Sequence, residues 1–425
     1  MKRNAAGTLF LVVLCAACSA PQTTTPAADN KAEHVGILIF GDSGYHPDYP
    51  DQDDYEDLFT EEQYLESEWQ DWLEDHRPVD EYEPRPFAVS RVTGRIVPAT
   101  GMPGVAGAMR NFCRDIATCD FGVLVGDNIY PSGATLGADG VDDAQRYKDM
   151  FEDPYGSMVT SPDTYQTYVA LGNHDWETSR EGGFAQIAYL EQQPGFYMDG
   201  PFYSVKPAGA KGDVELFVID TSMLLASVPV REDSLNPDGS EGSLGNIEPP
   251  NYFVEPLTDA EKNQHIWLEN ALKNSTARWK LVLAHHPIWS SSGSKFEQAR
   301  VLRKLILPAM CKYADAYIVG HEHTLEIHTD SCAAALGEPT AKPLVQILSG
   351  AASKQRPLHT TFMQHQERKY PEHRTVFAEG MVWGFSYLDL HGDTASLKMM
   401  SVPDSGGSEI EVLYDYTFER RSAGN

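Results

Sequence analysis

Seven side chains that can bind metal ions stand just behind short apolar runs of the chain. They are Asp42, Asp127, Tyr130, Asn173, His285, His321 and His323. Carboxylate, phenol, amide and imidazole groups are ordinary ligands of transition metals. Seven such groups are about the number that two ions need while positions stay open for substrate and water. The residue types therefore predict a two-metal centre of the kind that catalyses hydrolysis.

Each of these side chains follows a run of residues that is typical of a buried strand. The five runs are Ile37–Phe40, Val123–Val125, Tyr168–Leu171, Leu281–Ala284 and Tyr317–Val319. Short β-branched runs with turn residues behind them indicate buried strands. The ends of such strands meet at one rim of an α/β sheet, where sites are built. We therefore expect the polar segments behind the five runs to lie together.

The order and the sequences of these polar segments resemble the motifs of the metallophosphoesterase (calcineurin-like) superfamily. They read GDSG from Gly41, GDNIY from Gly126, GNHD from Gly172, AHHPIWSSS from Ala284 and GHEH from Gly320. Within the superfamily they resemble the purple acid phosphatases, closest to the small tartrate-resistant type. The resemblance implies an α/β fold in which two stacked mixed β-sheets are flanked by α-helices, an αββα sandwich.

The resemblance also implies how the seven side chains divide between two ions. It assigns Asp42, Tyr130 and His323 to the first ion, Asn173, His285 and His321 to the second, and Asp127 to both. A phenolate is a strong donor that favours ferric iron, and a neutral amide oxygen leaves the other ion divalent. The expected cofactors are therefore two metal ions, Fe(III) with Fe(II), Zn or Mn.

His174 and Asp175, which follow Asn173, are the predicted catalytic residues. By the family pattern His174 faces the substrate, where it either stabilises the phosphoryl charge or protonates the leaving alcohol. Asp175 either orients His174 or is a solvent-facing carboxylate of the turn. We expect His286 not to be a metal ligand, and Glu322 to be a loop carboxylate or a partner of a ligand.

One histidine of the family pattern is missing. The small purple acid phosphatases carry a histidine shortly after the position of His285, where it helps the leaving group to depart. Here that segment reads Ser290-Ser291-Ser292-Gly293-Ser294. Acid catalysis then rests on His174 alone or on a residue from elsewhere. Three later histidines are candidates, although we expect each of them at the surface: His359, His365 and His373.

An acidic insertion, residues 46–87, interrupts the family pattern directly after Asp42. Its residues 48–83 include sixteen Asp or Glu and one basic residue, Arg77. Thr60 followed by Gln63 is a capping box that predicts a helix. The apolar face of this helix is expected to contain Leu65, Trp69, Trp72 and Leu73. We expect a solvated insertion over the body of the protein; the alternative is a lid near the site.

Other segments carry helix or strand patterns. Helices are expected at 104–118, 142–151, 184–192, 258–272 and 300–311, and late strands at 344–348, 382–390, 395–400 and 411–418. The first of these helices should carry Met109, Phe112, Cys113 and Ile116 on one face. The fourth should begin at the capping box of Thr258 and turn Ile266, Leu268 and Leu272 inward.

The N-terminal region has the features of an export signal. Lys2 and Arg3 precede the apolar stretch 9–17, which is too short to span a bilayer. Ala16-Ala17-Cys18 resembles a bacterial lipoprotein cleavage site with Cys18 as the lipidated residue; ordinary cleavage near Ala20 is the alternative. The predicted divisions are a signal peptide (1–17), a lipidated or disordered tether (18–33), a catalytic domain (34–420) and a tail (421–425). We expect a periplasmic or cell-surface lipoprotein.

Four further cysteines are Cys113, Cys119, Cys311 and Cys332. An even set in an exported chain indicates disulfides. Sequence proximity favours the pairs Cys113–Cys119 and Cys311–Cys332, although four cysteines allow three pairings.

Composition limits the partners. A formal net charge of −29 argues against nucleic acid or anionic membranes, so that a lipid on Cys18 is the only expected membrane contact. The expected function is hydrolysis of phosphate monoesters, on phosphorylated small molecules or phosphoproteins, by a metal-bound hydroxide. One alternative is a Mn- or Zn-dependent phosphodiesterase or nucleotide hydrolase. Another is a non-catalytic surface protein that binds ligands on the same scaffold.

Overall fold

The computed structural model describes most of the chain from His34 onward. The described residues are 34–49, 55–138, 140, 142–158, 165–210, 212–226, 228, 230–231, 235–242, 247–248, 254–293, 296–403 and 407–421. The predicted signal peptide and tether, with Cys18, lie outside them, as do residues 422–425. Among the helices within these ranges, none has both the length and the apolar character needed to cross a membrane.

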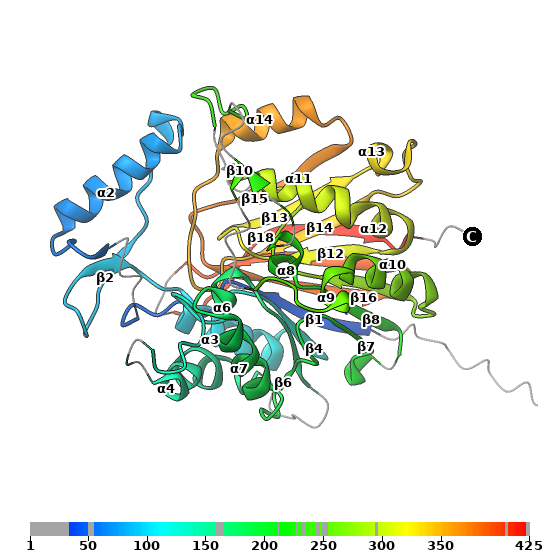
Figure 1. Cartoon of the computed structure of the whole chain (residues 1–425), viewed down its shortest axis with the longest axis horizontal. Helices are drawn as coiled ribbons and strands as arrows, with labels where there is room; N and C mark the ends of the chain where they lie inside the picture. The colour runs from blue at the N-terminus through cyan, green and yellow to red at the C-terminus, as the bar shows by residue number, and fades with distance from the viewer. Residues whose placement is uncertain are drawn as a thin grey trace, which may run out of the picture. The chain divides into compact units, whose positions relative to one another are not determined.

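Two seven-stranded sheets lie face to face (Figure 1). The first has the order β18 (Glu411–Glu419), β17 (Thr394–Ser401), β16 (Gly384–His391), β1 (His34–Phe40), β4 (Phe121–Val125), β5 (Thr167–Ala170) and β6 (Phe196–Tyr197). The second has the order β15 (His373–Glu379), β13 (Leu325–Asp330), β14 (Leu344–Ser349), β12 (Ala316–Val319), β11 (Trp279–Leu283), β8 (Val214–Val218) and β7 (Tyr203–Val205). In each sheet four neighbouring strands are parallel and the others antiparallel, so both sheets are mixed.

The central strands are buried on both faces. In β11, Leu281 and Leu283 belong to the cluster between the sheets, whereas Val282 belongs to the cluster under the outer helices. Side chains alternate between the faces of a strand, so a strand covered on both sides carries a continuous apolar run. The burial of these runs explains why the predicted strands form, and the predicted α/β sandwich is confirmed.

Helices cover the outer faces of both sheets. α10 (Gln264–Asn274), α11 (Phe296–Leu305) and α12 (Leu307–Tyr313) pack on the second sheet, and α3 (Met102–Asp115) and α7 (Arg180–Leu190) on the first (Figure 1). The shorter helical segments are η1 (Val79–Glu81), α4 (Asp143–Tyr147), η2 (Lys148–Glu152), α5 (Asp153–Tyr155), α6 (Asn173–Trp176), η3 (Ala208–Ala210), α8 (Thr221–Ala226), α9 (Asp259–Lys262) and α13 (Ala333–Leu336). The minor strands are β2 (Phe87–Val89), β3 (Ile96–Pro98), β9 (Val230–Arg231) and β10 (Ile247–Glu248).

Several predicted helices differ in detail from the structure. The predicted helix 300–311 is divided between α11 and α12, and the predicted helix 142–151 between α4 and η2. α3 ends at Asp115, so Ile116 leaves the helical face and is 67% exposed. The predicted helix 258–272 begins at the expected cap of Thr258 but is divided into α9 and α10 at Asn263, whose side chain bonds to the carbonyl of Asp259. Ile266, in α10, is 49% exposed. The inward position of Ile266 was therefore wrong, as was the place of Ile116 on a helical face.

The capped helix of the insertion is present as α2 (Glu61–Glu74). Thr60 accepts a hydrogen bond from the backbone of Gln63, and the Gln63 side chain accepts one from the backbone of Thr60. The apolar face is rotated from the one predicted, because Tyr64 is buried whereas Leu73 is 38% exposed.

The later chain contains more secondary structure than the sequence pattern indicated. The four predicted late strands correspond to β14, β16, β17 and β18. Three further elements were not predicted: β13, which precedes β14, and α14 (Thr360–Lys369) and β15, which lie between β14 and β16. Both predicted disulfides, Cys113–Cys119 and Cys311–Cys332, are present.

Candidate metal centre

The predicted ligands stand behind strands that end at one rim. Asp42 follows β1, Asp127 follows β4 and Asn173 follows β5, and these strands are parallel neighbours. In the second sheet His285 follows β11 and His321 follows the parallel strand β12. The backbone N–H of His321 donates to Oδ2 of Asp42 at 2.8 Å, which joins the rims of the two sheets.

Three of the predicted ligands at this rim have left-handed backbone conformations, which set the directions of their side chains. Asp42, Asp127 and His321 have φ angles of 52°, 53° and 72°. A non-glycine residue in this left-handed region costs about 1–2 kcal/mol, and such conformations gather at functional sites. Glycine is required at position 172, because a Cβ atom there would lie 2.2 Å from Oδ1 of Asp127.

A first cluster of donors surrounds the phenol oxygen of Tyr130. This oxygen lies 2.9 Å from Oδ2 of Asp127, 3.2 Å from Oδ1 of Asp42 and 3.3 Å from Nε2 of His323. Nε2 of His323 is 3.5 Å from Oδ1 of Asp42. Four oxygen and nitrogen donors thus converge on one small volume.

A second cluster surrounds the amide oxygen of Asn173. This oxygen lies 3.1 Å from Nε2 of His285 and 3.0 Å from Nδ1 of His321. Nε2 of His285 is also 3.3 Å from Oδ1 of Asp127. Asp127 therefore belongs to both clusters through different carboxylate oxygens, and all seven predicted ligands come together.

The backbone holds His285 in the orientation that a ligand needs. Its Nδ1 donates to the carbonyl of Val125 at 2.9 Å, so that Nε2 is the nitrogen that faces the second cluster. Metal-bound histidines are usually oriented by such a bond from the other ring nitrogen.

Buried oxygens of the first cluster raise one another's pKa values. Burial raises the pKa of Asp42 well above its ordinary value, and the nearby charge of Asp127 adds to this effect. Burial likewise raises the pKa of Tyr130, together with the charges of Asp127 and Asp42. Only a strong positive charge makes the loss of these protons favourable, so the donor set fits a metal centre.

His174 lies beside the first cluster on its accessible side. Its backbone N–H donates to Oδ1 of Asp127 at 3.0 Å, and its side chain is 23% exposed. Nδ1 contacts the carbonyl of Pro131 and is 2.8 Å from Oε2 of Glu177, whereas Nε2 is 4.0 Å from Oδ2 of Asp127. Burial lowers the pKa of His174, but the charges of Asp127 and Glu177 outweigh it and raise that pKa overall.

Asp175 is 1% exposed, so a solvent-facing position was wrong. Its carboxylate accepts bonds from the backbone of Gly172 at 2.7 Å and of Asn128 at 2.9 Å, and from the side chain of Gln186 at 3.1 Å. Burial and the charge of Asp127 raise its pKa to about 7. Among the described contacts of this carboxylate, none is to the imidazole of His174. Asp175 instead connects the segments that carry Asp127 and Asn173.

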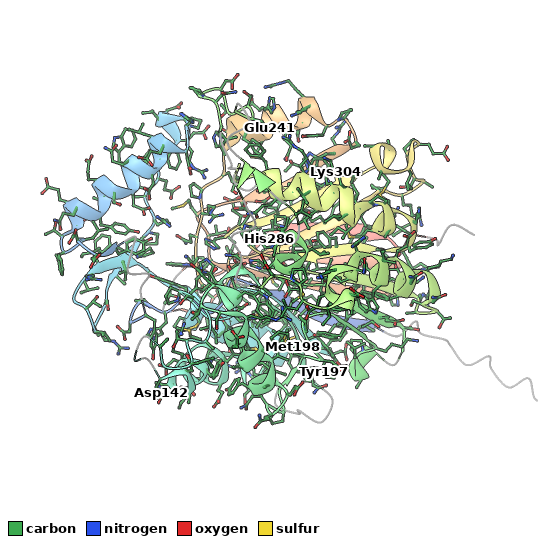
Figure 2. The ribbon with its side chains drawn as sticks, in the orientation of Figure 1. Asp142, Tyr197, Met198, Glu241, His286 and Lys304 are labelled. Atoms are coloured by element: carbon green, nitrogen blue, oxygen red, sulfur yellow. A yellow bond between two sulfur atoms is a disulfide. The ribbon has the colours of Figure 1, made fainter. Side chains whose placement is uncertain are left out.

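Among the remaining histidines, His286 packs against the predicted ligand His321, with ring centres 4.4 Å apart. His286, labelled in Figure 2, lies against α8, where its Nδ1 is 2.8 Å from Oγ1 of Thr221. His359 and His373 are fully buried, so surface positions for them were wrong. His359 caps α14, and Nε2 of His373 is 2.9 Å from Nδ1 of His328. His365 is partly buried in α14.

The insertion reaches the segments that surround the site. Arg77 donates at 3.0 Å to the carbonyls of Pro357 and Leu358, and at 3.2 Å to that of Ser292. A cavity of about 280 Å³ lies between α2 and residues 355–357. It is lined by residues that include Asp71, Trp72, Glu74, Arg77, Gln355 and Arg356.

Sequence reasoning missed two cations on the segment behind β14. Lys354 has its Nζ 4.5 Å from the ring centre of Tyr130, and Arg356 forms an ion pair with buried Glu322. The signal available was the position of this segment, since β14 is a buried strand followed by polar residues, like the five strands whose ends were considered.

Comparison with known proteins agrees with this geometry. Residues 102–325 match the family described as calcineurin-like phosphoesterase. Purple acid phosphatase 4 of Arabidopsis thaliana is 26% identical over 238 residues, which are 55% of this chain and 59% of that protein. Purple acid phosphatase 17 of the same plant is 27% identical over the same shares. The match thus covers less than two thirds of the length of either relative.

A solved structure shares the fold. It is GAP50, described as the anchor in the inner membrane complex of Plasmodium, with a TM-score of 0.52 and 15% identity. The superposition covers 92% of this chain and 90% of that one. At this identity the similarity concerns the fold alone.

Proposed function

Because the chain belongs to the calcineurin-like phosphoesterase family, we propose that it is a two-metal phosphatase that hydrolyses phosphate monoesters. Its similarity to proteins named purple acid phosphatases supports a phosphatase. One observation carries the proposal. Two donor clusters share Asp127, whose Oδ2 is 2.9 Å from Tyr130 and whose Oδ1 is 3.3 Å from His285. Paired sites that share a carboxylate suit two-metal hydrolysis.

The two clusters differ in the metal that they favour. We assign Asp42, Tyr130 and His323 to a ferric ion, Asn173, His285 and His321 to a divalent iron, zinc or manganese ion, and Asp127 to both. The phenolate is the group that favours Fe(III), and the neutral amide of Asn173 suits a divalent ion. When bound, such a pair supplies Lewis acidity and an activated water for hydrolysis.

His174 is the proposed acid for the leaving alcohol. Its Nδ1 is held by the carbonyl of Pro131 and by Glu177, so Nε2 is the nitrogen directed to the accessible side of the first cluster. A positioned acid contributes about 10²–10⁴-fold to rate in enzymes. Asp175 supports the reaction indirectly, by fixing the segment that carries His174.

The alternative to this proposal is a non-catalytic role. The fold is shared with a protein described as an anchor, and a fold does not by itself imply a reaction. The complete set of seven donors supports catalysis here, because a scaffold protein has no need of a strained polar rim.

The first experiment measures metal content and the visible spectrum of protein purified without added metals, followed by hydrolysis of p-nitrophenyl phosphate and bis(p-nitrophenyl) phosphate. We expect two metals per chain including iron, a tyrosinate-to-ferric charge-transfer band, and monoester turnover at acidic pH. Two metals without iron or colour, with preference for the diester, would instead establish a Mn- or Zn-dependent phosphodiesterase or nucleotide hydrolase. A chain without turnover on either substrate would be a binding protein.

We also propose that the protein is exported and carries a lipid on Cys18. Two disulfides and the N-terminal pattern support this location. Cys18→Ser should move the protein from the membrane fraction to the periplasmic fraction. An unchanged distribution would exclude the lipid anchor.

A further inference from the structure

A lysine and a histidine flank the ring of Tyr130. Nζ of Lys354 lies 4.5 Å from the centre of this ring, and the ring centre of His174 also lies 4.5 Å from it. The phenol oxygen at the end of the same ring touches Asp42 and Asp127. The ammonium group of Lys354 therefore contacts the ring whose phenol oxygen belongs to the first donor cluster.

The segment that carries Lys354 is bonded to the ligand segments on both sides. The backbone of Ser353 donates to the carbonyl of Asp42 at 3.1 Å, and the Ser353 hydroxyl bonds to the same carbonyl. The backbone of Arg356 donates to the carbonyl of His323 at 3.0 Å. Lys354 is therefore positioned by the same backbone that positions two predicted ligands.

The neighbours of Lys354 keep its charge near the site. Its Nζ also lies 5.3 Å from the ring of Tyr45, and aromatic faces attract ammonium groups. Arg356, two residues further, adds a second cation, fixed by buried Glu322.

A cation near the site can offset the repulsion between this acidic protein and an anionic substrate. The chain carries a formal net charge of −29, which repels anionic substrates at a distance. Salt screens that long-range field within about 10 Å, whereas a charge in direct contact with the substrate acts at close range. A lysine at the rim can therefore attract a phosphate group that the rest of the surface repels.

We propose that Lys354 binds a terminal oxygen of the substrate's phosphoryl group and thereby makes the site select phosphate monoesters over diesters. This inference rests on the proposed function and names the substrate class of the same site. A monoester carries close to two negative charges at pH 7 and presents three terminal oxygens. A diester carries one charge and has an ester group where the third oxygen would be. Removal of the ammonium group should therefore cost the monoester more.

The test compares the metal-loaded wild type with Lys354→Met, which keeps most of the aliphatic length over the two tyrosine rings. Binding of inorganic phosphate and of dimethyl phosphate is measured by calorimetry at pH 7.5. We also measure kcat/KM for p-nitrophenyl phosphate and its diester at this pH. We expect about a tenfold or greater loss of phosphate affinity and of monoester kcat/KM, and a change within about twofold for the two diesters.

Three further variants isolate the charge. Lys354→Arg should retain most of the selectivity, and Lys354→Gln repeats the test should the methionine variant fail to fold. Lys312→Met is the matched control, because Lys312 is a half-exposed lysine 3.2 Å from Glu269 on the outer helices. It should leave all four measurements unchanged. Metal content is measured for every variant.

Equal losses for phosphate and dimethyl phosphate, or no loss for either, would overturn the inference. The proposed function is judged separately, from turnover by the wild type. A wild type without turnover whose phosphate affinity still depends on Lys354 would leave the phosphate contact established and remove the phosphatase. Monoester turnover that is unchanged in the Lys354 variants would support the phosphatase and exclude the proposed contact of Lys354 with phosphate.

Discussion

The phenol oxygen of Tyr130 lies 2.9 Å from Oδ2 of Asp127, while Oδ1 of the same carboxylate faces His285 at 3.3 Å. Asp127 therefore presents each of its oxygens to a different group of donors. Burial opposes its ionisation, but the charges of His285 and His174 outweigh burial and lower the pKa of Asp127. An ionised carboxylate at the junction of two donor groups is suited to hold two cations at once.

Asp127→Ala should remove both metals and all turnover, because it takes one oxygen from each cluster. Asn173→Ala should reduce the content to about one metal per chain, because Asn173 belongs to the second cluster only. Elemental analysis of the purified variants measures both effects. Full metal content in the Asp127 variant would contradict the shared role.

Tyr130→Phe should abolish the visible band, because the variant lacks the phenol oxygen that would bind ferric iron. Tyr45→Phe is the matched control. Tyr45 packs against Tyr130 with ring centres 6.2 Å apart, and its hydroxyl donates to the carbonyl of Pro98 at 3.1 Å. The control should stay coloured. Colour that persists in the Tyr130 variant would mean that another residue produces the band.

His174→Ala should keep both metals and lower kcat by about 10²–10⁴-fold, as the loss of a positioned acid does. The effect should be smaller for substrates with good leaving groups, which need less protonation. Steady-state kinetics with a series of phenyl phosphates measures this difference. Unchanged kinetics would exclude His174 from the reaction.

Arg77→Met tests whether the insertion serves as a lid. The variant lacks the guanidinium group that donates to the carbonyls of Ser292, Pro357 and Leu358. Because these carbonyls lose a charged donor, the free energy of unfolding should fall by roughly 2–4 kcal/mol. If the insertion covers the site, KM for bulky monoesters should rise while metal content stays constant. Arg91→Met is the control, because Arg91 is an exposed residue just behind the insertion and pairs with Asp48 within it. A KM that does not move would remove the lid hypothesis, as would an unchanged KM after deletion of residues 48–83.

His359 should make the attachment of the insertion sensitive to acid. Burial, together with the charge of Arg77, lowers the pKa of His359 from 6.5 to about 4. A depressed pKa means that the folded state disfavours the protonated ring. The contribution of neutral His359 to the free energy of unfolding is therefore fully present above pH 6.5 and is lost as the pH falls toward 4. The loss amounts to about 3 kcal/mol at most. Denaturant unfolding at pH 7 and pH 4 should show a smaller difference for His359→Gln than for wild type; equal differences would contradict this role.

Several features could be predicted because they depend on local pattern. Each apolar run ends in a polar turn, so the positions of Asp42, Asp127 and His285 at strand ends followed from their neighbours in sequence. The resemblance to metallophosphoesterases and purple acid phosphatases is confirmed. The closer similarity to the small tartrate-resistant type remains a prediction.

Other features depend on contacts between distant parts of the chain. Asp175 is buried because Gly172, Asn128 and Gln186 surround it, and no spacing within its own turn indicates this. The burial of His359 likewise involves a contact with a distant part of the chain, the carbonyl of Asp75 in the insertion.

By itself, the sequence determined the fold class, the two disulfides and the set of seven donors, because strand patterns, cysteine proximity and turn residues act over short stretches of chain. Only the tertiary structure decided that Asp127 divides its oxygens between two clusters, that Arg77 attaches the insertion near the site, and that Lys354 stands over Tyr130. The physical reason is that these relationships join segments from different strands and loops. Their geometry is set by the packing of the two sheets and not by any neighbouring residues.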